Sequence, residues 1–107
     1  MAFKVAVVTL APGGDPKKHR ASVKTSKIEI TTVVGNLGDF DRAVDVCTDL
    51  VRKEGVQAIF LCPFFNQAEV ARVAEAVGES IPIAVARSDV PGAMRMGAIL
   101  TKEGWFK

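Results

Sequence analysis

Residues 3–10 read Phe-Lys-Val-Ala-Val-Val-Thr-Leu, and this run decides the fold class. Its centre, Val5 to Val8, is continuously apolar with no polar alternate face, which is the pattern of a strand buried on both sides of a parallel sheet. Pro12, Gly13 and Gly14 follow within a few residues and end the run. Because a buried parallel sheet needs helices on its faces, we expect an α/β protein.

Three further runs predict strands: Ile28–Val34, Ala58–Cys62 and Ile83–Arg87. Ile28–Val34 alternates apolar and polar residues, as a strand at a sheet edge does, whereas Ala58–Cys62 is continuously apolar and belongs in the centre. With Phe3–Leu10 they form a mostly parallel sheet of four strands. Gly97–Leu100 is a candidate for a fifth strand.

Helical stretches separate these strands. The clearest has one apolar face from Phe40 to Val51, follows a capping residue at Asp39 and stops at Gly55. Another begins after a cap at Asn66 and ends at Gly78.

Two other segments have weaker patterns. Asp15-Pro16 is a helix-start signal, so a short polar helix is expected from there through about Val23. Beyond Pro91 only a helical turn at Met94–Met96 is indicated, and the structure of the tail stays open.

Strands joined by helical crossovers pair in parallel with right-handed connections. Numbered in chain order, the four strands are expected in the order 2-1-3-4, a flavodoxin-like winding in a three-layer sandwich, and residues 1–107 form a single domain. The order reverses between the first and third strands. The loops Ala11–Asp15 and Cys62–Asn66 therefore flank the point where open α/β sheets bind ligands, with Arg87–Asp89 beside them.

Composition excludes several classes of function. The 14 Lys and Arg residues against 12 Asp and Glu leave a formal charge of +2, too small to indicate a nucleic acid or a membrane surface as partner. No apolar run approaches the roughly 20 residues of a membrane span. Cys47 and Cys62 fit no common zinc or redox spacing. We therefore expect a cytoplasmic protein with free thiols, no metal and no cofactor.

The favoured function is binding of a small anionic metabolite beyond the ends of the first and third strands. Glycine backbone N–H groups and basic side chains would hold the anion, with an aromatic wall beside it. The candidate ligand-binding residues are Gly13, Gly14, Asp15, His19, Arg20, Phe64, Asn66, Arg87 and Asp89. All of them except Phe64 have a structural alternative: a glycine turn, helix caps, a solvated basic turn, or an ion pair between Arg87 and Asp89.

An enzyme in the same cleft is the second hypothesis. Cys62 would be the nucleophile and His19, the only histidine, the general base. Because Pro63 to Phe65 separate the thiol from the helix cap, a buried structural cysteine is the alternative, and Cys47 is expected to be one.

The third hypothesis is an interaction subunit that self-associates into a dimer or larger assembly. Apolar side chains lie in loops and in the tail, where no helical pattern buries them, namely Phe64, Phe65, Met94, Met96, Trp105 and Phe106. Such patches mark interfaces in soluble proteins. The alternative is a tail that folds back over its own sheet.

One resemblance is visible in these residues. The stretch Ala11–Pro16 with His19-Arg20, the helix ending Val70–Gly78 and the strand end Ala84–Asp89 resemble a family of short bacterial proteins known only as a domain of unknown function. The resemblance covers most of the chain. It implies the fold and a bacterial origin, and it implies no activity and no catalytic residues.

Overall fold

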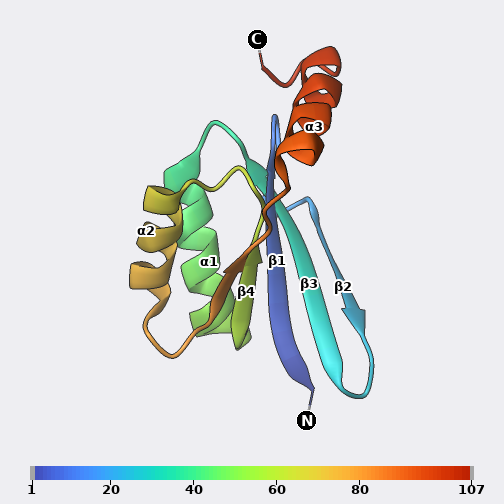
Figure 1. The fold of residues 1–107 in the computed structure, drawn as a ribbon. Helices are drawn as coiled ribbons and strands as arrows, with labels where there is room; N and C mark the ends of the chain where they lie inside the picture. The colour runs from blue at the N-terminus through green and yellow to red at the C-terminus, as the bar shows by residue number, and fades with distance from the viewer. Residues whose placement is uncertain (1, 107) are drawn as a thin grey trace.

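The computed structural model of this chain describes residues 2–106 (Figure 1). The elements in chain order are β1 (Phe3–Ala11), β2 (Arg20–Lys24), β3 (Ile28–Asn36), α1 (Phe40–Glu54), β4 (Ala58–Leu61), α2 (Gln67–Val77), β5 (Ile83–Val85) and α3 (Val90–Lys102). The chain is an α/β protein, as predicted.

The five strands form one sheet in the order β2-β3-β1-β4-β5. The neighbours β3-β1, β1-β4 and β4-β5 are parallel, so the expected pairings of the four predicted strands are confirmed. The flavodoxin-like order is wrong, because β2 adds antiparallel to β3 and makes the sheet mixed. For the same reason β3 is an interior strand and not the edge that its alternating pattern predicted.

The short helix expected from Pro16 through Val23 is wrong. Residues 15–19 instead form a turn, in which the backbone N–H of His19 donates to the carbonyl oxygen of Asp15 at 2.7 Å. The following residues alternate, with Ala21 and Val23 on one side of β2. A short polar helix is only marginally stable in water, because it buries little apolar surface. Residues 20–24 are more stable as a strand that pairs with β3.

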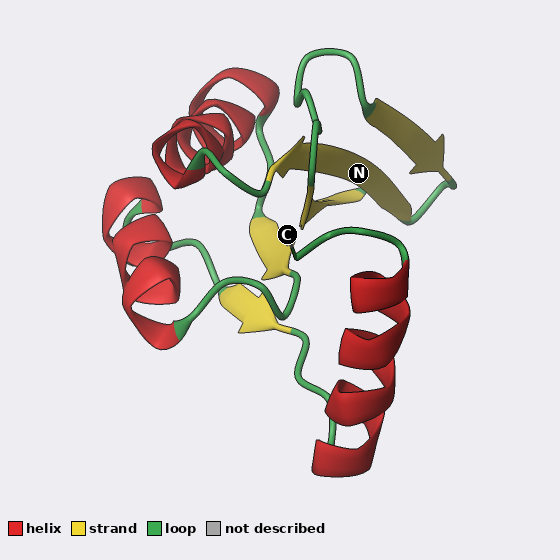
Figure 2. Cartoon of the chain, turned by 90° about the horizontal axis from the view of Figure 1, so that it is seen from above, coloured by secondary structure: helices red, strands yellow, loops and turns green. Residues whose placement is uncertain are grey.

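Helices α1 and α2 cover one face of the sheet (Figure 2). Ala6, Val8 and Leu10 of β1 point into the core on this side and are at most 3% exposed, as are Cys47 and Leu50 of α1. The four predicted ends of these helices, at Asp39, Gly55, Asn66 and Gly78, are confirmed. Gly55 caps α1 in the left-handed region at φ 73°, and Asn66 and Glu69 form a reciprocal capping box at the start of α2.

In the part of the chain that the structure describes, no helix covers the opposite face, so the third layer of the expected sandwich is missing there. Strand residues alternate between the two faces, and register places paired residues on the same face. We call the uncovered side the open face. Its residues are Phe3, Val5, Val7 and Thr9 of β1, Ala21 and Val23 of β2, Ile28, Ile30, Thr32 and Val34 of β3, Ala58 and Phe60 of β4, and Ala84 of β5.

Helix α3 lies beyond the carboxyl ends of the strands, on the side of the open face (Figures 1 and 2). The Asp89 carboxylate accepts the backbone N–H of Gly92 at 2.7 Å and caps the helix, and Pro91 lies in its first turn. The fifth strand expected at Gly97–Leu100 is therefore wrong, since those residues are helical. None of the α3 residues is buried. Within residues 2–106, no helix is long and apolar enough to cross a membrane.

Candidate functional site

A cavity of about 510 Å³ lies at the carboxyl ends of β1, β4 and β5, beneath α3. This volume falls within the range typical of small-molecule sites, roughly 300–1,000 Å³. Most of its wall is apolar. Its lining residues are Thr9, Cys62, Pro63, Phe64, Arg87, Ser88, Ala93, Met96, Gly97, Leu100, Trp105 and Phe106.

The side chains of Phe64 and Phe65 point in different directions, one towards the cavity and one into the core, as expected for two adjacent aromatic residues after a strand. The ring of Phe65 is fully buried in the core, where it packs edge-on against Phe40 at 5.6 Å between ring centroids. The ring of Phe64 instead stacks on Trp105 at 5.6 Å and meets Phe106 edge-on at 6.1 Å. The expectation that Phe65 belongs to an exposed patch is therefore wrong, and Phe64 builds an aromatic wall of the cavity.

Among the cavity-lining residues within the described range 2–106, Arg87 is the one that carries a charge. Its Nη1 donates to the carbonyl oxygen of Pro63 at 3.1 Å, and its Nη2 donates to that of Phe65 at 2.9 Å. The ion pair expected with Asp89 is not formed, since Asp89 caps α3. A guanidinium carries more N–H donors than these two bonds use, so Arg87 can hold the loop and still offer donors to an anion.

Both thiols are free and buried. Cys47 lies on the buried side of α1, and burial raises the pKa of its thiol to about 12, as expected of a structural cysteine. Cys62 is 9% exposed and lines the cavity, so it is the thiol that a bound molecule would meet.

The glycine turn does not reach this cavity. A Cβ at Gly14 would overlap the carbonyl oxygen of Gly35, so Gly14 is required by a close backbone approach. The Asp15 carboxylate accepts the backbone N–H of Lys17 and pairs with Arg42, each at 3.0 Å. The Lys17 N–H bond, assisted by the Arg42 charge, lowers the pKa of Asp15. These contacts support the turn that was the structural alternative for this segment.

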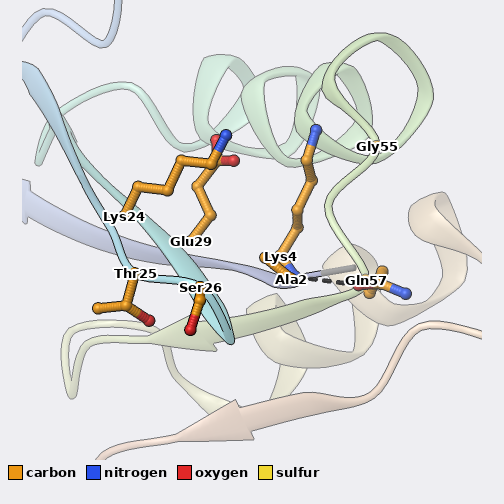
Figure 3. A pocket seen from close by; sticks show the side chains of 8 residues that line it. All are labelled: Ala2, Lys4, Lys24, Thr25, Ser26, Glu29, Gly55 and Gln57. Atoms are coloured by element: carbon orange, nitrogen blue, oxygen red, sulfur yellow. Dashed lines mark hydrogen bonds between the residues drawn. The ribbon is translucent and has the colours of Figure 1, made fainter.

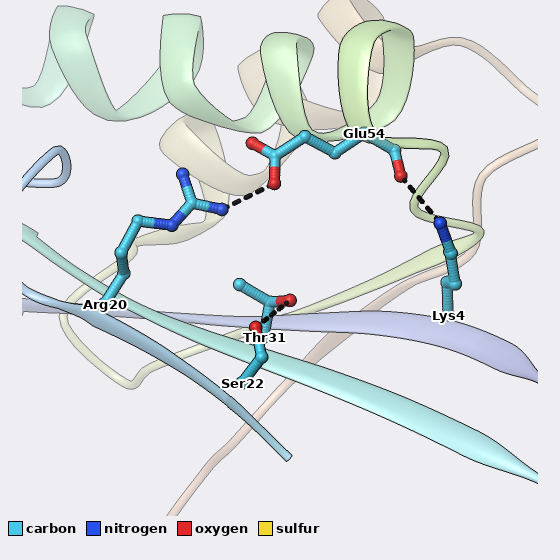
Figure 4. A network of polar contacts seen from close by, with 5 residues as sticks. All are labelled: Lys4, Arg20, Ser22, Thr31 and Glu54. Carbon is cyan, nitrogen blue, oxygen red and sulfur yellow. Dashed lines mark hydrogen bonds and ion pairs between the residues drawn. The ribbon is translucent and has the colours of Figure 1, made fainter. Parts of the chain in front are cut away.

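His19 and Arg20 also have structural partners. The Nδ1 atom of His19 accepts the backbone N–H of Asp15 at 2.9 Å, which leaves the proton of the neutral ring on Nε2. Arg20 pairs with Glu54 of α1 at 2.6 Å (Figure 4). In the same network Lys4 Nζ donates to the Glu54 carbonyl oxygen at 3.3 Å, and the hydroxyls of Ser22 and Thr31 lie 3.0 Å apart.

The structure thus separates the residues that the sequence placed in one cleft. Phe64, Arg87 and Cys62 line the cavity together. The remaining candidates do not line it: Gly13, Gly14, Asp15, His19, Arg20, Asn66 and Asp89. Asn66 and Asp89 are helix caps, which was the alternative for Asn66, whereas the alternative for Asp89 was an ion pair.

Two other hollows carry charge, and both are less suited to an anion. One, of about 470 Å³, lies at the opposite end of the sheet, where Lys4, Lys24 and Glu29 rise towards α1 (Figure 3). The other, of about 400 Å³, lies along α1 and mixes basic with acidic side chains, including the pair Lys53–Asp49 at 3.5 Å. Both hollows place carboxylates beside their cations, Glu29 in the first and Asp45, Asp49 and Glu54 in the second, and these carboxylates repel an anionic ligand.

The sequence-based prediction did not include the part of the cavity wall that α3 and the tail supply, namely Ala93, Met96, Gly97, Leu100 and Trp105. The signal for it was present in Asp89-Val90-Pro91, which is a cap followed by proline in the first turn. No group of three or more His, Cys, Asp or Glu side chains within residues 2–106 is arranged to hold a metal ion.

Comparison with known families gives one match. The model described as "Family of unknown function (DUF6506)" matches residues 3–100. The chain belongs to this family. The matched range contains every described strand and nearly all of α3, so it spans most of the residues that line the cavity, whereas Trp105 and Phe106 lie outside the match. Comparisons with curated proteins and with solved structures give no match. The family assignment does not bear on the bacterial origin, which stays a prediction.

Proposed function

We propose that this DUF6506 member binds a small carboxylic acid with an apolar body in the cavity beneath α3. The observation that carries the proposal is a mostly apolar cavity of about 510 Å³ in which Arg87 is the one charged side chain among the described lining residues. Sites of this kind bury the apolar part of a ligand and use a few polar groups to orient it.

The wall and the cation act on different parts of the ligand. Phe64, Trp105 and Leu100 offer aromatic and aliphatic surface, and apolar area removed from water contributes about 25 cal/mol per Å². Arg87 offers a fork of N–H donors whose plane is already set by Pro63 and Phe65. A hydrogen bond to a charged group is worth about 1.5–3 kcal/mol, so an acid should bind well ahead of its neutral amide.

Binding is better supported than catalysis by Cys62 and His19. The thiol lines the cavity, but the imidazole does not, and the Nδ1 lone pair of His19 is engaged by the Asp15 N–H. A nucleophile without a neighbouring base is not activated by the arrangement that thiol enzymes use.

Trp105 provides a direct assay, because it is the single tryptophan, the chain has no tyrosine, and the indole lines the cavity. The probes are butanoate, 4-methylpentanoate, benzoate and phenylacetate, each beside its amide. We expect a saturable change in tryptophan fluorescence with at least one acid below about 1 mM, and weaker binding of the matching amide.

Gly97→Leu tests the location of the binding site. Gly97 lines the cavity, and a Cβ added there meets no atom within 4 Å, so the position has room for the start of a larger side chain that should occupy the site. It should abolish the response, while Ala71→Leu on the exposed side of α2 should keep it. The proposal fails if no acid gives a saturable response, or if Gly97→Leu responds as the native chain does.

A further inference from the structure

We propose that two copies of this chain form a symmetric dimer in which α3 of each copy packs on the open face of its partner. This inference is independent of the proposed ligand. From the sequence we expected self-association through apolar residues in loops and the tail. The proposed interface is instead formed by two surfaces, the open face of the sheet and α3.

The open face has the composition of an interior. None of its residues is charged, although the other face of the same strands carries Lys4, Lys24 and Glu29. Val23 is 66% exposed, Phe60 46% and Phe3 45%. A sheet face in contact with water normally carries polar side chains, whereas only Thr9 and Thr32 are polar on this one, as on a sheet face that helices cover.

Helix α3 is the complementary surface. Only Arg95 and Lys102 are charged among its 13 residues, yet none of the 13 is buried. Val90 is 74% exposed and Met94 71%, and their spacing places both on one side of the helix. Neither lines the cavity, so this outer side is available while the inner side keeps its contacts. A helix that is apolar all round is normally buried.

The accessible surface of the chain is large enough to include an interface with another protein. A compact protein of 11.4 kDa exposes about 5,800 Å², whereas this chain exposes 6951 Å². The excess of about 1,200 Å² exceeds the roughly 800 Å² that each partner buries in a stable protein interface. The radius of gyration, 14.2 Å against about 13 Å for a compact chain of this length, has the same cause, which is the projecting helix.

A second copy fits because one chain carries both halves of the contact. Each copy offers a helix and needs a cover for its sheet, so a two-fold axis satisfies both surfaces at once and leaves neither unpaired. A different protein that covered the sheet would leave α3 exposed.

The test is molar mass by light scattering after size exclusion at about 50 µM, which detects dimers with micromolar dissociation constants. We expect the native chain to elute at twice 11.4 kDa. Phe60→Asp on the open face and Met94→Asp on α3 should each give a monomer. Both side chains are exposed in the single chain, so neither change removes a core contact. The matched control is Ala71→Asp on α2, which should remain a dimer.

Mixing the two variants separates this arrangement from others. In a mixed pair, the unaltered sheet of the Met94→Asp chain meets the unaltered α3 of the Phe60→Asp chain, so the mixture should contain dimer that neither variant forms alone. A native chain that is monomeric overturns the proposal. A Met94→Asp chain that dimerises as the native chain does also overturns it, because the contact would then not involve α3.

Discussion

The guanidinium of Arg87 donates from Nη2 to the carbonyl oxygen of Phe65 at 2.9 Å and so joins the end of β5 to the loop after β4. The Phe65 ring is anchored in the core, which fixes the carbonyl, and Phe64 beside it walls the cavity. The cation proposed to bind the ligand therefore also holds the loop that shapes the site.

The Arg87 contact predicts a stability effect that needs no ligand. Arg87→Ala should lower the free energy of unfolding by about 1–2 kcal/mol, because the Phe65 carbonyl loses its partner in a partly buried position. Arg87→Lys should recover only part of the loss, since an ammonium cannot reproduce the planar fork. Urea unfolding measures both values. Arg95→Ala on the exposed side of α3 is the control, and it should stay within about 0.5 kcal/mol of the native chain.

The two glycines Gly14 and Gly97 should respond in opposite directions to alanine. Gly14→Ala forces its Cβ into the backbone of Gly35 and should cost about 1–3 kcal/mol. Gly97→Ala places a methyl group in open space within a helix and should stabilise by about 0.5–1 kcal/mol. Thermal unfolding monitored by circular dichroism tests the pair. A Gly14→Ala chain as stable as the native one would show that this turn tolerates a side chain.

The strands β1, β3, β4 and β5 and the helices α1 and α2 could be predicted because each pattern was local. Val5 to Val8 are continuously apolar, which indicates a strand inside the sheet. The caps Asp39 and Asn66 lie next to the helices that they cap. The hairpin β2 could not be predicted in this way. Its five exposed residues are held by backbone pairing with β3, and the Asp15-Pro16 signal favoured a helix that the turn at His19 replaces.

The candidate site could be predicted only in part, for a related reason. Phe64, Arg87 and Cys62 follow strands, so topology alone brings them together at the sheet end. The wall from α3 depends on where a helix goes after β5, which the Asp89 cap begins but does not direct. His19 and the glycine turn also follow a strand, but their hydrogen bonds close on neighbouring backbone and not on the cavity.

Thiol labelling tests whether the cavity is the route to Cys62. In the folded chain, iodoacetamide should modify Cys62 slowly and Cys47 more slowly still, since the first lines the cavity and the second is fully buried. Gly97→Leu should slow Cys62 further by filling its approach. Peptide mass spectrometry resolves the two sites, and the urea-unfolded chain provides equal rates for reference. Labelling of folded Cys62 as fast as free cysteine would instead favour the enzyme hypothesis.

Cys47 predicts how stability depends on alkaline pH. Its pKa is about 12 in the folded chain, whereas an unfolded thiol ionises near pH 8.5. Below about pH 8.5 the Cys47 thiol is protonated in both the folded and the unfolded state, so its ionisation does not lower the free energy of unfolding. At higher pH the unfolded state loses its proton while the native state keeps it, so the free energy of unfolding falls as pH rises towards 12.

Comparison with Cys47→Ala isolates this effect from other alkaline titrations. Between about pH 7 and 10 the native chain should lose about 2 kcal/mol more stability than the variant, since each unit of pH above the unfolded pKa costs about 1.4 kcal/mol. The variant is less stable at pH 7, because the core at Cys47 is fully buried and a smaller side chain leaves a void there. The two urea-derived stability curves should therefore converge as pH rises. Parallel curves would mean that the folded core accommodates the thiolate. Cys47 would then not be the neutral structural thiol that its position on the buried side of α1 implies.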